Sequence, residues 1–232
     1  MANFVWVTPI RLLKLRSKDA VVANPFSTRY TQPGALSYLC DQTDPQRLCR
    51  ILEQEELASR SSRAFQIVGP HGCGKTSLTV AIAEILADQA VATCWLTIRA
   101  RSRSDRVRFD RYLPCPSSKN RPELLVVDGI ESVNRFQRSS MLRHFRKNFW
   151  RVILTTHRPI WGVEKLSELK PSFDCFHSLC RQLLGRTATE SDWPQKIETA
   201  FEAANGNFRE AFFDLYDEYE NSAAQSYSSP TS

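Results

Sequence analysis

Short apolar runs alternate along the chain with longer stretches in which apolar residues recur every three or four positions. Four short runs have the length of buried strands: 64–69, 91–98, 124–128 and 151–156. Three longer stretches have the spacing of helices with one buried face: 43–59, 77–90 and 132–149. Apolar strands that alternate with helices predict an α/β three-layer sandwich with a mainly parallel sheet. A further apolar run, FDCFHSL at 173–179, predicts a fifth strand.

The pattern becomes purely helical toward the end of the sequence. Three short helices are expected at 178–186, 192–204 and 207–220, and together they would form a small helical lid. The sequence therefore predicts an N-terminal segment with a leading helix, a core domain, a lid and a tail, at 1–60, 61–177, 178–220 and 221–232. The tail, NSAAQSYSSPTS, has too few apolar residues to build a core, and we expect it to be disordered.

The composition narrows the class of protein. With 232 residues, of which 42% are apolar, the chain can bury one large core and one small appendage. Seven cysteines without a Cys-x-x-Cys pair, beside four histidines, predict reduced thiols and no zinc site. Because no uninterrupted apolar stretch approaches about eighteen residues, we expect a cytoplasmic protein without a membrane span. The net charge of +6 is compatible with a phosphate-rich partner.

One glycine-rich segment lies between the first predicted strand and the helix that follows it. Its sequence, GPHGCGKT, matches the pattern G-x-x-x-x-G-K-[ST] of a phosphate-binding loop, or P-loop. Glycines allow backbone N–H groups to converge on a polyphosphate at the start of a helix, whereas the alternative is a chance match in an ordinary turn. Lys75 is expected to reach the β and γ phosphates, and the Thr76 hydroxyl to bind Mg²⁺. The predicted nucleotide-binding residues of this segment are Gly69, Pro70, His71, Gly72, Cys73, Gly74, Lys75, Thr76 and Ser77.

Carboxylates follow the third predicted strand. Asp128 ends the run Leu-Leu-Val-Val-Asp, at a sheet edge that faces the phosphates in a fold of this kind, and it would help to hold Mg²⁺. The commonest ATPase pattern has a glutamate directly after this aspartate, but this chain has Gly129. Glu131 is the nearest carboxylate and the candidate general base that orients water. It could equally be a capping residue of the next helix.

The fourth predicted strand ends in Thr156 and His157, beside the expected position of the γ-phosphate. Either side chain could bind that phosphate, or it could satisfy backbone groups at the strand end.

Together these elements resemble the AAA+ group of P-loop ATPases over about residues 24–220. The stretch Thr-His-Arg-Pro at 156–159 is similar to the family's sensor 1 motif, Thr-Asn-Arg-Pro, with His157 at the position of the Asn. The stretch Gly-Asn-Phe-Arg at 206–209 is similar to its sensor 2 motif. The resemblance implies that Arg209 reaches the γ-phosphate from the lid and that the NPF segment, 24–26, lines the adenine pocket. The alternatives are that Arg209 is an ordinary surface charge and that the NPF segment is a turn packed on the core.

A looser likeness is to uncharacterised bacterial P-loop proteins with the same NPF, GPHG and late Gly-Asn-x-Arg features. No function comes with that likeness.

The sequence leaves three functions open. The first is a Mg²⁺-dependent ATPase that couples ATP hydrolysis to movement of the lid or a partner, with Lys75, Glu131, His157 and Arg209 at the chemistry. The second is an ATP-gated binding switch with negligible turnover, because no glutamate follows Asp128. The third is a small-molecule kinase. ATP is the expected nucleotide, since no lysine follows Asn or Thr as in the guanine-reading dipeptide of GTPases.

The partner is less defined than the nucleotide. Residues 99–111, RARSRSDRVRFDR, carry six arginines against two aspartates and could grip a nucleic acid, or could be a solvated insertion. An unidentified protein partner or self-assembly is the other expectation, because AAA+ relatives commonly complete one subunit's site with an arginine of the next. Four arginines on the predicted helix at 132–149 have the right type, but none of them is identified as that residue: Arg135, Arg138, Arg143 and Arg146.

Overall fold

The computed structural model describes residues 24–36, 38, 43–58, 63–91, 93–98, 124–185 and 192–228. The chain forms two compact units. Of the described residues, the first unit comprises 43–58, 63–69, 75–91, 93–98 and 124–169, and the second comprises 24–36, 38, 70–74, 170–185 and 192–228. The basic segment 99–111 lies outside the described residues.

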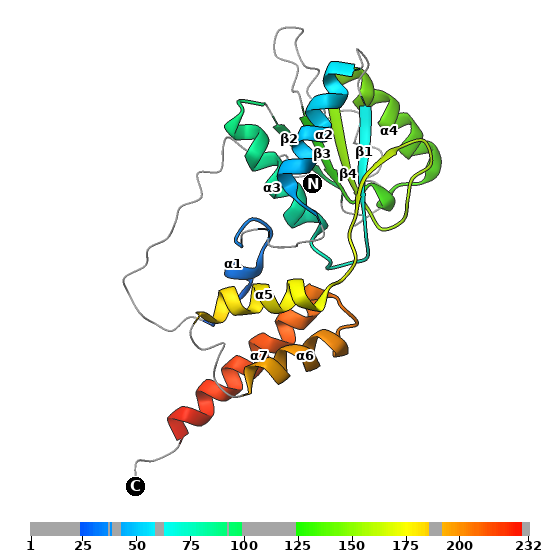
Figure 1. The fold of residues 1–232 in the computed structure, drawn as a ribbon. Helices are drawn as coiled ribbons and strands as arrows, with labels where there is room; N and C mark the ends of the chain where they lie inside the picture. Colours follow the sequence, from blue (N-terminus) through cyan, green and yellow to red (C-terminus); the bar gives the residue numbers. More distant parts are fainter. Residues whose placement is uncertain are drawn as a thin grey trace. The chain divides into compact units, whose positions relative to one another are not determined.

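The first unit is built on a five-stranded sheet (Figure 1). Its strands are β1 (Arg63–Val68), β2 (Thr93–Thr97), β3 (Leu124–Asp128), β4 (Arg151–Thr156) and β5 (Glu164–Glu168). All neighbouring pairs are parallel, in the order β2-β3-β4-β1-β5. The predicted α/β fold with a parallel five-stranded sheet is therefore confirmed.

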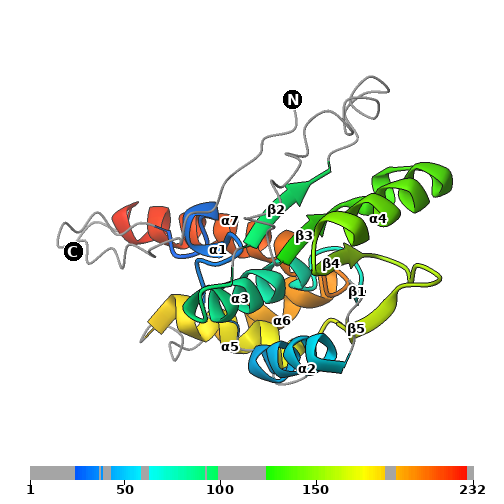
Figure 2. The ribbon, with the colours of Figure 1, turned by 90° about the horizontal axis from the view of Figure 1, so that it is seen from above.

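Helices cover both faces of this sheet and complete three layers (Figure 2). On one face, α4 (Arg135–Asn148) buries Leu142 and Phe145 in a cluster with Val152 and Leu154 of β4. On the other, α3 (Lys75–Asp88) buries Leu78, Ile82 and Leu86, and α2 (Pro45–Ala58) packs against α3. Because the strands run parallel, their C-terminal ends, and the polar residues that follow them, lie at one edge of the sheet.

The identity of the fifth strand was predicted wrongly. Residues 173–179 belong to α5 (Phe173–Leu184), whose N-cap Ser172 accepts a hydrogen bond from Cys175 N at 3.4 Å. Its buried residues recur at helical intervals: Cys175, Phe176, Cys180 and Leu184. The observed fifth strand, β5, has the polar sequence EKLSE and pairs only with β1, so it is an edge strand without the apolar run that a buried strand shows.

The second unit is helical and has its own apolar core. Besides α5 it contains α1 (Thr28–Thr31), α6 (Trp193–Ala203) and α7 (Phe208–Ser228). Phe26 is 1% exposed and packs its ring 5.7 Å from Trp193 and 6.3 Å from Phe212, between ring centroids. Because α7 continues to Ser228, the predicted disordered tail is wrong for residues 221–228. No helix among the described residues is long and apolar enough to cross a membrane.

The NPF segment is a structural part of this helical core. The Asn24 amide donates to Tyr216 O and to Glu220 Oε1, both at 2.9 Å, while its Oδ1 accepts from Phe26 N at 3.0 Å. These bonds hold the turn that delivers Phe26 to the cluster of aromatic rings. Such contacts match the alternative of a turn packed on a core, in this case the core of the helical unit.

Candidate functional site

The P-loop follows the geometry that phosphate binding requires. β1 ends at Val68, Gly69 N bonds to Thr156 O at 3.1 Å, and α3 begins at Lys75. Gly72 and Gly74 have φ angles of +72° and +89°, which residues with a side chain rarely adopt. A Cβ built on Gly74 meets nothing within 4 Å, so the space beside this turn is open. Open space at a helix N-terminus, where the first N–H groups have no acceptor within the helix, fits a polyphosphate.

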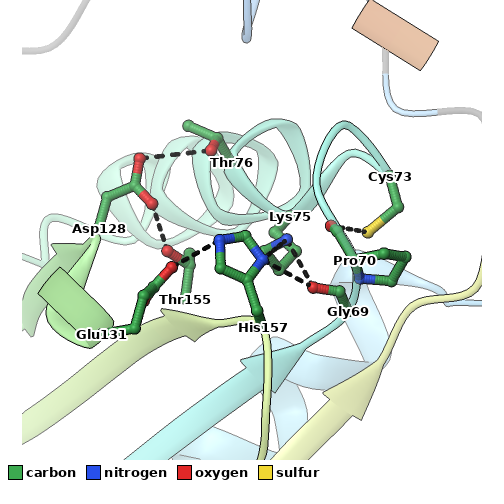
Figure 3. Close-up of polar contacts among 9 residues, drawn as sticks. All are labelled: Gly69, Pro70, Cys73, Lys75, Thr76, Asp128, Glu131, Thr155 and His157. Carbon is green, nitrogen blue, oxygen red and sulfur yellow. Dashed lines mark hydrogen bonds and ion pairs between the residues drawn. The ribbon is translucent and has the colours of Figure 1, made fainter. Parts of the chain in front are cut away.

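The remaining residues of the loop take different positions. Pro70 and His71 are exposed, whereas Cys73 is buried and donates its thiol hydrogen to Pro70 O at 3.1 Å (Figure 3). Ser77 is half-buried in the first turn of α3.

Asn207 of the sensor 2-like stretch lies against the P-loop turn inside the second unit. A Cβ built on Gly72 would be 1.7 Å from Asn207 Oδ1, so only glycine fits there. Asn207 also caps α7, since its Oδ1 accepts from Arg209 N at 3.1 Å. Gly206, with φ +75°, ends the preceding turn beside Pro171. Arg209 itself is exposed on the first turn of α7.

Lys75 is buried at the centre of the first unit's polar cluster (Figure 3). Its Nζ donates to Gly69 O at 2.7 Å and lies 3.3 Å from His157 Nδ1. His157 Nδ1 also lies 3.3 Å from Gly69 O, so it can either accept from the Lys75 ammonium group or donate to the carbonyl oxygen.

Asp128 accepts two hydroxyl hydrogen bonds from neighbouring elements. Thr76 Oγ1 lies 3.4 Å from its Oδ2, and Thr155 Oγ1 donates to its Oδ1 (Figure 3). Thr155 is the register partner of Asp128 across β3 and β4, a contact that we did not predict. The predicted Thr156 is also buried, but its Oγ1 has no hydrogen-bond partner within the described ranges.

Mg²⁺ fits the donors of this cluster. The Thr76 hydroxyl and the Asp128 carboxylate are hard oxygen ligands, and Mg²⁺ usually takes one or two carboxylates and completes its shell with waters and phosphate oxygens. Among the described residues, no group of three or more His, Cys, Asp and Glu side chains could hold a metal ion by itself.

The structure explains why no glutamate follows Asp128. Gly129 has φ +84°, and a Cβ built on it would lie 2.4 Å from Ile98 O. The Ile98 backbone is held in place because its N–H donates to Asp128 O at 2.8 Å. A glutamate at position 129 would therefore combine a strained backbone with a steric clash.

Glu131 brings a carboxylate to the site from a later position. It lies in a short 3-10 helix, η2 (Ile130–Ser132), which the left-handed Gly129 starts. Its Oε1 is 2.7 Å from His157 Nε2, so the imidazole fixes one carboxylate oxygen. Its Oε2 is buried and has no hydrogen-bond partner in the part of the chain that the structure describes. The predicted residues Lys75, Glu131 and His157 thus form one chain of polar contacts (Figure 3).

Gln66 supports the turn after His157, a role that the sequence analysis did not predict. It is 2% exposed in the middle of β1. Its Nε2 donates to Ile160 O at 3.1 Å and to Val163 O at 2.8 Å, while its Oε1 accepts from Ile160 N at 2.7 Å. The one hint of this role in the sequence is that Gln66 is a polar residue inside the apolar run 64–69. Its buried amide is well satisfied, because both its oxygen and its nitrogen form hydrogen bonds.

The sheet order and the glycine-rich loop before α3 give the three-layer α/β fold of P-loop NTPases, and similar solved structures share this fold. The structure of Drosophila ORC bound to DNA matches with a TM-score of 0.59 and 16% identity, over 91% of this chain and 64% of that one. Cdc6p from Pyrobaculum aerophilum matches with a TM-score of 0.56 and 13% identity, over 85% and 66%. The Aeropyrum pernix ORC1 protein in complex with DNA matches with a TM-score of 0.56 and 16% identity, over 84% and 63%.

At 13–16% identity, these similarities show the fold alone. The chain spans 64%, 66% and 63% of the three matched chains, so each of them is longer than the region of similarity. No protein-family model and no curated protein matches the sequence. The looser likeness to bacterial P-loop proteins stays a prediction.

Proposed function

We propose that this protein is a Mg²⁺-dependent ATPase in which Glu131 is the general base and His157 positions it. The observation that carries the proposal is the unequal environment of the two Glu131 oxygens. Oε1 is held 2.7 Å from His157 Nε2, and Oε2 is buried without a hydrogen-bond partner among the described residues. An oriented carboxylate whose second oxygen makes no such bond can accept the proton of an attacking water.

The other residues of the cluster have separable tasks. The P-loop N–H groups and Lys75 would bind the phosphates, for which Lys75 Nζ exchanges its 2.7 Å bond to Gly69 O for a phosphate oxygen. Thr76 and Asp128 would hold Mg²⁺, which neutralises phosphate charge when bound. Thr155 keeps the Asp128 carboxylate oriented from the neighbouring strand. Arg209 remains a proposed γ-phosphate contact, supported by its place in the sensor 2-like stretch.

Turnover is further proposed to move the helical unit or a bound partner. The contact of Asn207 with Gly72 supports this, because a change in the P-loop turn at Gly72 would displace the cap of α7. Nucleic acid is one proposed partner class, since two similar solved structures are described as bound to DNA.

The test is phosphate release from ATP and Mg²⁺, measured beside nucleotide binding. Lys75→Ala should abolish turnover, and Glu131→Gln should retain binding but lose roughly 10²–10⁴-fold in rate, as expected for a general base. Glu164→Gln, an exposed carboxylate of the same unit, is the matched control and should turn over normally. Tight binding without turnover in the wild type would identify an ATP-gated switch and overturn the ATPase proposal.

A further inference from the structure

The outer face of α4 carries basic and aromatic residues that the nucleotide site does not use. Phe136 is 90% exposed. Arg143 and Lys147 lie seven and eleven positions further on, so at 100° per residue all three project within about 40° of one another. They form a stripe about 16 Å long. Its opposite face is the one that buries Met141, Leu142 and Phe145.

The charge of this helix has one sign. Its sequence, RFQRSSMLRHFRKN, contains five Arg and Lys residues and no acid. Arg146 and Lys147 occupy the last turn, where cations stabilise a helix, but Arg135 is in the first turn, where a cation opposes the helix dipole. Interaction with the helix dipole therefore explains the basic residues in the last turn of α4 but not Arg135 in its first turn.

A fully exposed tryptophan stands beside this helix. Trp161 is 99% exposed in the turn between β4 and β5. The turn lies against the C-terminal half of α4, because Arg146 Nη2 donates to Gly162 O at 2.8 Å, and both views place the two segments side by side (Figures 1 and 2). Arg158, just before the turn, is also exposed.

The backbone of this turn is fixed, so the indole ring is presented from a rigid support. Val163 N bonds to Ile160 O at 3.3 Å, and Gly162 adopts φ +76° as the third residue of a tight turn. The buried Gln66 holds both ends of the turn through its three hydrogen bonds. Exposing a whole indole gives no folding stability, because burial is what stabilises an apolar ring.

We propose that the outer face of α4 and the turn at 160–163 bind single-stranded nucleic acid. Exposed rings can stack on bases only where those bases are not already stacked in a duplex, and cations beside them attract the phosphate backbone. The nearest acids on β5 do not oppose this charge, because Glu164 pairs with Arg63 and Glu168 with Lys165. The inference builds on nucleic acid as the proposed partner class but does not depend on ATP turnover.

The probe is a fluorescein-labelled oligo-dT, titrated with the full chain in the absence of nucleotide and followed by fluorescence anisotropy. Phe136→Ala with Trp161→Ala should weaken binding roughly fivefold or more per ring and leave the salt dependence unchanged. Arg143→Ala with Lys147→Ala should lower the slope of log K against log salt by about 1.4, the value for two lost contacts to a single strand. Phe213→Ala on α7 and Arg181→Ala on α5, an aromatic residue and a cation that are exposed in the helical unit, are the matched controls.

Phosphate release by the two double variants of this surface, without nucleic acid, should equal that of the wild type, which separates this surface from the ATPase site. The inference is overturned if the variants bind the oligonucleotide as the wild type does, or if a duplex of equal length competes equally well. It is also overturned if sedimentation shows that the substitutions dissociate an oligomer without changing oligonucleotide binding, because the face would then join two copies of the chain.

Discussion

Replacing Gly129 by alanine should destabilise the protein by a predictable amount. A non-glycine residue in the left-handed region costs about 1–2 kcal/mol. The added Cβ would also lie 2.4 Å from Ile98 O, and relieving such an overpacked contact costs about 1–3 kcal/mol more. The expected total is about 2–5 kcal/mol, which a domain of ordinary stability survives.

Gly162→Ala is the matched control for the backbone part of this cost. Its φ of +76° is close to the +84° of Gly129, but a Cβ there meets nothing within 4 Å. Urea unfolding followed by circular dichroism gives the free energy of unfolding for both variants. Gly129→Ala should be the less stable by about 1–3 kcal/mol. Equal losses would refute the claim that the Ile98 carbonyl excludes a side chain from position 129.

Two further predictions concern the two cores. Phe26→Ala should cost about 3–5 kcal/mol, because the ring is 1% exposed among the aromatic residues of the helical unit, and hydrogen exchange of the α6 and α7 amides measures the loss. Phe213→Ala on the exposed side of α7 should cost much less, and equal costs would contradict the assignment of Phe26 to that core. Burial raises the pKa of the Cys49 thiol from 9.0 to about 11, so the unfolded chain releases this proton first as the pH rises. The free energy of unfolding should therefore fall between about pH 9 and 11, and Cys49→Ala should remove that part of the fall.

The sequence predicted those parts of the fold in which local pattern and tertiary role agree. The runs 124–128 and 151–156 are strands over those same residues, because central strands buried on both faces must be apolar. β5 was missed because an edge strand can be polar, and its pairing with β1 depends on a partner far along the chain. The run at 173–179 was misread because apolar residues three and four apart also resemble a short apolar strand.

The site residues also divide into those that local sequence spacing predicts and those that only the tertiary structure brings together. The P-loop could be predicted because its glycines and lysine have fixed spacing along the chain. The pairing of Glu131 with His157 could not, because it depends on the 3-10 turn after Gly129 and on the register of β3 and β4. Thr155 and Gln66 were missed for the same reason, since their partners are set by strand pairing and by the path of the β4–β5 turn.

The central claim is that Glu131 and His157 act as one unit in ATP hydrolysis. A double-mutant cycle with Glu131→Gln, His157→Asn and the combined variant tests it directly, with phosphate release measured at saturating ATP and Mg²⁺. If His157 works by positioning Glu131, the double variant should be about as slow as Glu131→Gln alone. Losses that multiply in the double variant, or full activity in Glu131→Gln, would contradict the account.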